Sequence, residues 1–245
     1  MRWSGSAKLG LGWGLFQGEA GDNTPHEHHA VQIVLSAAPL RIWSAPAGWR
    51  SCVGAVIGAD VRHQIEPSPQ AVTLIYLEPD SPEGQALATF AGGGWRELDA
   101  VQSRSLIAQL QAAPVESPAR VVVQALGVAL SAAPTHGDAL IAALLRELPR
   151  PLPARLPAAL LARRAGLSVG RLQHRLRAHT GMALRPYLRW LRLLRAMEQV
   201  AAGGALTDAA LEAGFADAAH FSRTCRRHFG ITPRALLKMR FATPP

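Results

Sequence analysis

The chain has 245 residues, of which 49% are hydrophobic and 18% are charged, and its formal net charge is +9 at pH 7. This length is enough for one large domain or two small ones, each with a buried core. The charge is uneven, because residues 1–135 hold 8 Lys or Arg against 11 Asp or Glu, whereas residues 136–245 hold 18 against 6. We therefore expect a polyanionic partner only for the carboxyl-terminal part.

The cysteine content and the hydropathy of the sequence indicate the cellular compartment in which we expect the protein. Cys52 and Cys225 are the two cysteines, and they lack metal-type spacing. This is typical of a reducing compartment and excludes a disulfide framework. The apolar stretch 9–16 is short and interrupted by glycine, and no apolar run reaches eighteen residues. The sequence predicts a soluble cytoplasmic protein without a membrane partner.

Residues 1–90 consist of short β-type runs separated by Gly, Pro, Asn and Asp. Short strands at this spacing favour a small barrel or a sandwich, and periodicity does not choose between them. The predicted strands are 11–17, 30–35, 40–44, 51–57 and 71–77.

A group of histidines stands out in this first part. His26 and His28 flank Glu27, His29 follows them, and His63 comes later. Imidazole nitrogens suit iron, zinc or nickel, but they also line pockets for organic ligands. The residues that we assign to a pocket for a small organic ligand, which becomes an effector pocket only through the family resemblance given below, are His26, His28, Gln32, Trp43 and His63. The alternative for Trp43 is plain core packing.

The middle of the chain predicts two helices after a break at Gly92–Gly94. One helix has its apolar face on Leu98, Val101, Leu106, Ile107 and Leu110, and the next has it on Val121, Val122, Leu126, Val128 and Leu130. They cover an open side of the β-domain, pair with a second subunit, or do both. Residues 132–136 are the predicted linker.

Residues 136–202 predict a helix-turn-helix and a long helix. Asp138 caps a first helix, and a second helix with apolar Leu156, Leu160 and Leu161 turns at Gly166. Ser168 caps the next helix, with Val169, Leu172 and Leu176 inward and Gly170, Arg171, Gln173, His174, Arg175 and Arg177 on its other side. A helix over 183–202 then has a predicted length of roughly 30 Å, which suits two reading helices about 34 Å apart in adjacent grooves.

Residues 206–236 predict a second helix-turn-helix. Thr207 is the expected cap of a short helix, and Gly214 ends it. Asp217 starts the following helix, whose buried stripe is Phe221, Cys225 and Phe229. Its other face is basic, and a helix of this kind enters the major groove.

The string G-F-x-D-x-x-x-F-S-R-x-x-x-R-x-F-G-x-T-P at residues 214–233 resembles the signature of the AraC/XylS family of bacterial transcription regulators. The segment L-S-x-x-x-L-Q at residues 167–173 is similar to the same family. The resemblance implies an α+β multidomain fold with a cupin-like β-barrel at residues 1–90, linker or dimerisation helices at 91–135 and a double helix-turn-helix domain at 136–245.

The resemblance also implies which side chains meet DNA. In the first reading helix the matching base-contact positions are Gly170, Gln173 and His174, of which Gln173 suits adenine and His174 a guanine acceptor. In the second helix they are Ala218, Ala219, Ser222 and Arg223, and Arg223 is the strongest candidate for guanine. The remaining basic residues, which we expect to hold phosphates, are Arg171, Arg177, Arg192, Arg226 and Arg227.

We therefore predict a DNA-binding regulator, without enzymatic activity or cofactor, that is controlled by a small molecule in its first domain. The expected partners are double-stranded DNA, the effector, a second copy of the chain and, for an activator, RNA polymerase. One alternative is a metal-dependent cupin enzyme fused to a DNA-binding domain, but Gln32 stands near the place of the glutamate that metal-binding cupins usually supply. Another is a nucleoid-type binder without effector control. The sequence leaves activation and repression open.

Overall fold

The computed structural model describes residues 1–245 except 11, 46, 113–116, 131–137, 150, 154, 238–239 and 243–245. Contacts divide the chain into two compact units. The first, here the sheet unit, comprises Met1–Leu130 and Cys225–Pro245, and the second, the helical unit, comprises Ser131–Thr224. The division falls inside helix α9 (Ala218–Phe229), so that helix contributes to both units.

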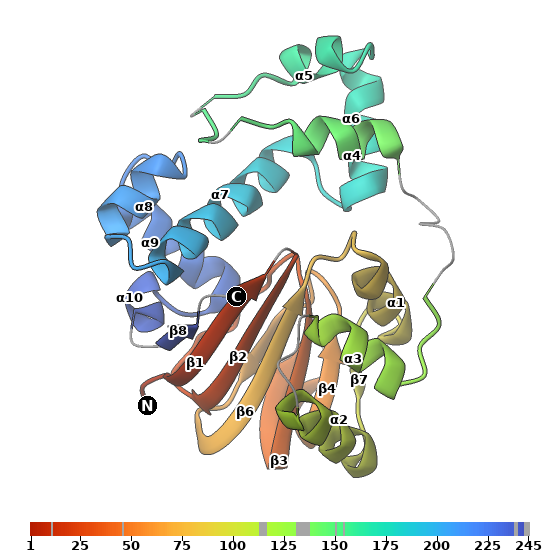
Figure 1. Ribbon diagram of the computed structural model, residues 1–245, viewed down its shortest axis with the longest axis vertical. Coiled ribbons are helices and arrows are strands. Elements are labelled where there is room, and N and C mark those ends of the chain that lie inside the picture. Colours follow the sequence, from red (N-terminus) through yellow and green to blue (C-terminus); the bar gives the residue numbers. More distant parts are fainter. Residues whose placement is uncertain are drawn as a thin grey trace. The chain divides into compact units, whose positions relative to one another are not determined.

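The sheet unit is built on one eight-stranded sheet (Figure 1). Seven of its strands follow the order β7-β4-β3-β6-β2-β1-β8, and the eighth strand, β5, pairs with β3. All pairings are antiparallel except that of β1 with β8. The strands are β1 (Ser4–Gly10), β2 (Trp13–Ala20), β3 (Val31–Ser44), β4 (Gly48–Ile57), β5 (His63–Ile65), β6 (Ser68–Leu77), β7 (Trp95–Glu97) and β8 (Arg240–Ala242).

The two faces of this sheet differ because side chains alternate along each strand. On β3, Ile33 and Leu35 enter the main apolar core, whereas Gln32 beside them is equally buried but polar. Three helices cover the apolar face and add Leu87, Leu106, Leu110 and Val122 to that core (Figure 1). They are α1 (Pro82–Phe90), α2 (Ala100–Ala112) and α3 (Pro118–Ala125).

Several expectations for this unit need correction. The runs 30–35 and 40–44 form one strand, β3, whose register against β4 shifts between Leu35 and Leu40. Strands β1, β5, β7 and β8 and helix α1 were not expected. Val101 is 68% exposed and Leu130 is 45% exposed, so neither belongs to the buried faces predicted for them. The predicted linker 132–136 lies outside the described residues.

The helical unit contains two short helix pairs joined by one long helix (Figure 1). The core around the first pair includes Leu161, Leu172 and Leu176, together with Leu188 of the long helix. The helices are α4 (Ala139–Arg146), α5 (Ala158–Arg164), α6 (Val169–Thr180), α7 (Leu184–Ala201) and α8 (Leu206–Glu212), followed by α9. After α9, α10 (Pro233–Leu236) belongs to the sheet unit.

Helix α7 corresponds to the long helix that the sequence predicts over residues 183–202. Its 18 residues correspond to about 27 Å, and Figure 1 shows α5 and α6 near one of its ends and α8 near the other. Two expectations here are wrong: Val169 is 39% exposed rather than inward, and Thr207 lies inside α8, whose N-cap is Ala205. In the described part of the chain, no helix is both long and apolar enough to cross a membrane.

Candidate DNA interface and histidine cluster

Helix α6 presents an uninterrupted exposed face. Its first turn is fixed by Ser168, whose hydroxyl accepts a hydrogen bond from the Arg171 amide at 3.2 Å. Leu172 and Leu176 are fully buried and hold the opposite face against the core. The candidate residues on this helix are all exposed, namely Gly170, Arg171, Gln173, His174 and Arg177. The surface predicted for the first reading helix is therefore accessible to a partner.

Helix α9 has the same two-sided construction. Asp217 caps it by accepting a hydrogen bond from the His220 amide. Phe221 and Cys225 are fully buried, and burial raises the pKa of the Cys225 thiol to about 12, so this cysteine is a core residue. Among the candidates on this helix, Ala219, Arg223, Arg226 and Arg227 are exposed, and Ala218 and Ser222 are half-buried.

The turn between α8 and α9 requires glycine. Gly214 has a φ of +86°, and a Cβ at this position would lie 2.8 Å from the Leu152 carbonyl oxygen and 3.0 Å from Arg192 Nε. Only glycine combines this backbone conformation with such a close approach. The glycine thus fixes how α8 leads into the second reading helix.

Arg192 does not share the exposed face of either reading helix. Its half-buried guanidinium donates a hydrogen bond to the Pro153 carbonyl at 2.7 Å, and burial, followed by the nearby Arg189, lowers its pKa. This contact braces α7 against the segment before α5. The structure therefore brings eleven of the twelve predicted DNA-binding residues onto α6 and α9 and places Arg192 apart from them.

Sequence reasoning missed the role of Arg175, which it placed with the outward basic residues of α6. Arg175 donates two hydrogen bonds to Asp138, the residue that caps α4 through the Ile141 amide at 3.2 Å. The pKa of the Asp138 carboxyl is lowered chiefly by the hydrogen bond from Arg175. This pair fixes α6 relative to α4.

The second candidate site is a buried histidine cluster in the sheet unit, made of His26, His28, His63 and Gln32. The backbones of His26 and His63 exchange two hydrogen bonds of 2.9 Å, which joins the segment before β3 to β5. The Gln32 Oε1 atom lies 2.7 Å from His63 Nε2 and 3.0 Å from His28 Nε2. Ring nitrogens of the three histidines all lie within 4.8 Å of one another.

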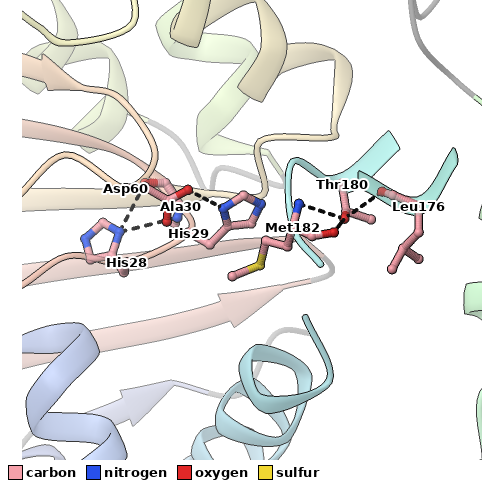
Figure 2. Close-up of polar contacts among 7 residues, drawn as sticks. All are labelled: His28, His29, Ala30, Asp60, Leu176, Thr180 and Met182. Carbon is pink, nitrogen blue, oxygen red and sulfur yellow. Dashed lines mark hydrogen bonds and ion pairs between the residues drawn. The ribbon is translucent and has the colours of Figure 1, made fainter. Parts of the chain in front are cut away.

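Each imidazole is also held from its Nδ1 side. His26 Nδ1 lies 2.8 Å from the Thr24 carbonyl oxygen, and His63 Nδ1 lies 2.8 Å from that of Val61. Figure 2 shows the His28 ring turned toward Ala30, whose carbonyl oxygen is 3.1 Å from His28 Nδ1. His29 points to a different partner, the Asp60 carboxylate, at 2.8 Å (Figure 2).

Burial keeps these imidazoles neutral. Burial, with a smaller contribution from His28, lowers the pKa of His26 to about 3. Burial likewise lowers the pKa of His28 to about 4, although the hydrogen bond between His28 Nε2 and the accepting Gln32 Oε1 acts in the opposite direction. Burial also holds the pKa of His63 well below its usual range. At neutral pH the ring nitrogens without a proton are therefore free to act as acceptors or metal ligands.

Of the five residues predicted for the effector pocket, four form this cluster. Trp43 is only half-buried and pairs with Trp49 and Gln64 across the sheet, while its neighbours Ile42 and Ser44 are buried. Because β-strand side chains alternate, Trp43 points away from the face that Ser44 shares with its pairing partner His63.

The cluster also has neighbours that the sequence did not indicate, at the carboxyl-terminal end of α9. The Phe229 ring lies 5.7 Å from the His28 ring and 5.9 Å from the Tyr76 ring, centroid to centroid. The Thr24 amide donates a hydrogen bond to the Gly230 carbonyl at 3.1 Å. These contacts join residues about two hundred positions apart, so no local pattern in the sequence could have shown them.

Comparison with known proteins finds relatives for the carboxyl-terminal part of the chain. A family model described as a helix-turn-helix domain matches residues 161–239. The HTH-type transcriptional activator RhaS of Escherichia fergusonii is 38% identical over 84 residues, which cover 34% of this chain and 30% of RhaS. RhaS of Salmonella arizonae is 31% identical over 111 residues, which cover 45% of this chain and 40% of that protein. The matched region thus spans less than half the length of these curated relatives.

Solved structures extend the likeness to the whole fold. ToxT of Vibrio cholerae aligns with a TM-score of 0.59 at 10% identity, over 92% of this chain and 98% of that chain. The apo structure of a ToxT variant from the same organism aligns with a TM-score of 0.63 at 8% identity, over 95% and 99%. At this identity the likeness concerns the fold, and it agrees with the predicted α+β architecture. Together with the matched domain, it supports the resemblance to the AraC/XylS family seen at residues 214–233: residues 161–239 form a helix-turn-helix domain similar to that of the transcriptional activator RhaS.

Proposed function

We propose that this chain binds specific sites in double-stranded DNA through α6 and α9 and that a small effector bound in the sheet unit controls this binding. One observation carries the proposal. Both helices bury an apolar stripe and leave the candidate base and phosphate contacts on the opposite face, in the half of the chain that holds the excess of basic residues.

The contacts divide into two kinds. Gln173, His174 and Arg223 carry side chains that hydrogen-bond base edges, whereas Gly170, Ala218 and Ala219 allow close approach and Ser222 offers one hydroxyl. The exposed arginines whose role is to hold phosphates are Arg171, Arg177, Arg226 and Arg227. Half-buried Arg192 is the weakest of the five predicted phosphate contacts, since its guanidinium already donates to the Pro153 carbonyl.

The test compares two arginines on sites obtained by selection from random DNA. Arg223→Ala should weaken the best site by about 1–3 kcal/mol and relax preference at one base pair. Arg177→Ala should weaken all sites alike and reduce the slope of log K against log salt by about one. Arg104, exposed on α2 of the sheet unit, is the matched control, and Arg104→Ala should leave binding unchanged. Equal losses for Arg223→Ala on every sequence would make that residue a phosphate contact.

Control by an effector is supported by the relatives. ToxT, whose fold the chain shares, has been solved with an unsaturated fatty acid bound, and RhaS carries the name of a transcriptional activator. A homodimer and RNA polymerase complete the proposed set of partners. The functional division into residues 1–90, 91–135 and 136–245 stays a prediction.

A further inference from the structure

The histidine cluster has an internal conflict of hydrogen-bonding roles. A carbonyl oxygen only accepts hydrogen bonds, so His63 Nδ1, 2.8 Å from the Val61 carbonyl, must carry the ring proton. The same holds for His26 Nδ1 beside Thr24. In a neutral ring the other nitrogen, Nε2, is then a lone-pair acceptor. His63 Nε2 nevertheless faces Gln32 Oε1, another acceptor, at 2.7 Å.

The amide nitrogen of the same side chain is equally anomalous. Gln32 is fully buried, and its Nε2 has no hydrogen-bond partner among the described residues. Burying a donor without a partner costs roughly 1–3 kcal/mol. Two arrangements remove the conflict at Oε1: the amide turns over and donates to His63 Nε2, or a cation lies between the amide oxygen and the imidazole nitrogens.

The geometry favours the cation, because one turned amide does not satisfy the whole cluster. Turning the amide leaves its oxygen where the unpartnered nitrogen now lies and does nothing for the lone pair of His26. A cation would accept electron pairs from all three imidazoles and from the amide oxygen. The neutral rings of His26 and His63, whose Nδ1–H groups donate to backbone carbonyls, are oriented as the ligands of metal sites usually are. His28 Nδ1 lies 3.1 Å from the Ala30 carbonyl oxygen and also accepts a hydrogen bond from the Ala30 amide at 3.3 Å.

We propose that His26, His28 and His63, with Gln32 Oε1 as a fourth ligand, bind a divalent first-row transition metal ion, and that this ion is the effector of the regulator. Imidazole nitrogens select for such ions over magnesium or calcium. The Nδ1 protons stay in place, so binding releases no proton from His26 or His63. The inference rests on the proposed function for its regulatory part, while the metal site stands on the cluster alone.

Metal binding would fix the spacing of the cluster. One ring nitrogen of each histidine lies within 4.8 Å of those of the other two, whereas nitrogens bound to one zinc ion at about 2.0–2.1 Å are separated by no more than about 4.2 Å. Any pair that is farther apart than this must move toward a common centre when the ion binds. Their displacement is the mechanical signal that distinguishes the loaded state from the free state.

The end of α9 is placed to receive this displacement. Gly230 has a φ of +69°, and a Cβ there would lie 2.6 Å from His26 Nδ1 and 2.6 Å from the Thr24 carbonyl oxygen. The backbone at Gly230 is therefore packed directly against the segment of Thr24 and His26, with no room for a side chain between them. The His28 and Phe229 rings form a second contact between them. All of these residues belong to the sheet unit, so movement of His26 or His28 displaces the last turn of α9.

The first test uses the full chain, freed of metal with a chelator and then titrated with Co²⁺, whose visible absorption reports its coordination. We expect one ion per chain, and X-ray absorption of the loaded protein should show three imidazole ligands. Absence of a stoichiometric site, or a site with fewer than two imidazoles, overturns the metal assignment without the use of any variant.

Variants then test which residues bind the ion. His63→Gln and His26→Gln should each weaken Co²⁺ binding at least 100-fold. Glu27→Gln is the matched control, because Glu27 is an exposed carboxylate between two of the proposed ligands, and it should bind Co²⁺ as the wild type does. Equal weakening by Glu27→Gln would indicate a surface site and overturn the assignment. If a histidine variant does not fold, the number of imidazole ligands measured by X-ray absorption on the wild-type protein decides instead.

The regulatory arm measures affinity for a selected DNA site with Zn²⁺ and with chelator. We expect a change of at least about 5-fold. The change should shrink in Phe229→Leu, because this variant removes the ring contact with His28 without altering a proposed ligand, and the variant should still bind Co²⁺. Stoichiometric metal with unchanged DNA affinity overturns the effector role and leaves the metal-dependent enzyme as the better account of the cluster. Loss of all specific DNA binding, with the metal site intact, would instead refute the proposed function.

Discussion

The buried histidines predict a strong acid sensitivity of the folded chain. His26 faces His28, His63 and His228, and the pKa values of His26 and His28 are lowered to about 3 and about 4 by burial. The unfolded chain binds protons at these residues near pH 6.5, whereas the folded chain does not. Stability is therefore complete above about pH 6.5 and falls as the pH drops from there toward the folded pKa values.

The magnitude follows from the width of that window. One pKa unit corresponds to about 1.4 kcal/mol, so at pH 5 each of these two residues costs about 2 kcal/mol relative to neutral pH. Together they cost about 4 kcal/mol, and His63, whose pKa is also lowered, acts in the same direction. The free energy of unfolding of a typical domain is about 5–15 kcal/mol. The loss is therefore a large fraction of the total.

The assay is urea unfolding of the full chain between pH 7.5 and 5, with a chelator present so that only protons compete for the imidazoles. The free energy of unfolding should fall by at least about 2 kcal/mol per pH unit below pH 6. His28→Gln should reduce this slope by about 1.4 kcal/mol per unit, whatever its effect at neutral pH. His174→Gln, on the exposed face of α6, is the histidine control. A flat profile, or a wild-type slope in His28→Gln, would refute the reasoning.

Two further predictions concern the helical unit. Gly214→Ala should destabilise this unit by at least about 1–2 kcal/mol, because the φ of Gly214 is +86° and the added Cβ would meet the Leu152 carbonyl oxygen. Chemical unfolding measures this loss, and an unchanged unfolding midpoint would mean that the turn relaxes to accept the side chain. Asp138→Ala should cost about 1 kcal/mol for the lost α4 cap, in addition to its contact with Arg175. Since Arg175 lowers the pKa of Asp138, the penalty should be full near pH 7 and shrink only in strong acid, where the wild-type carboxyl is protonated; a penalty that persists there would contradict the ionic role.

Local chemistry in the sequence was enough to locate α6 and α9, the two helices that we propose contact DNA. Ser168 and Asp217 start α6 and α9, and Gly214 ends the helix before α9, because caps and left-handed turns depend on a few adjacent residues. The apolar stripe through Phe221 and Cys225 was equally visible. The prediction for Thr207 was wrong. A hydroxyl side chain caps a helix only when its residue occupies the N-cap position, directly before the first helical residue, and in α8 that position is Ala205.

Features that depend on distant partners were not predictable. Strand β1 lacks the β-branched and aromatic residues that favour strands, and it forms because β2 pairs with it on one side and β8 on the other. Arg192 looks like any other arginine of α7 by spacing, but the Pro153 carbonyl makes it a structural residue. The grouping of three histidines was visible as a motif, whereas its contact with Phe229 was not.

The position of this contact on α9 bears on how an effector would act. Arg223 and Phe229 lie six residues apart on one helix, which is about 9 Å along its axis. If α9 stays helical, a shift of its last turn would reach the proposed base contact through this one helix. Helix α6 has no comparable connection to the cluster along the chain, because α7 and α8 intervene. An effector acting on the cluster should therefore change base preference in the half-site read by α9 and leave the α6 half-site as it was, and equal changes in both half-sites would instead require that the whole double motif moves together.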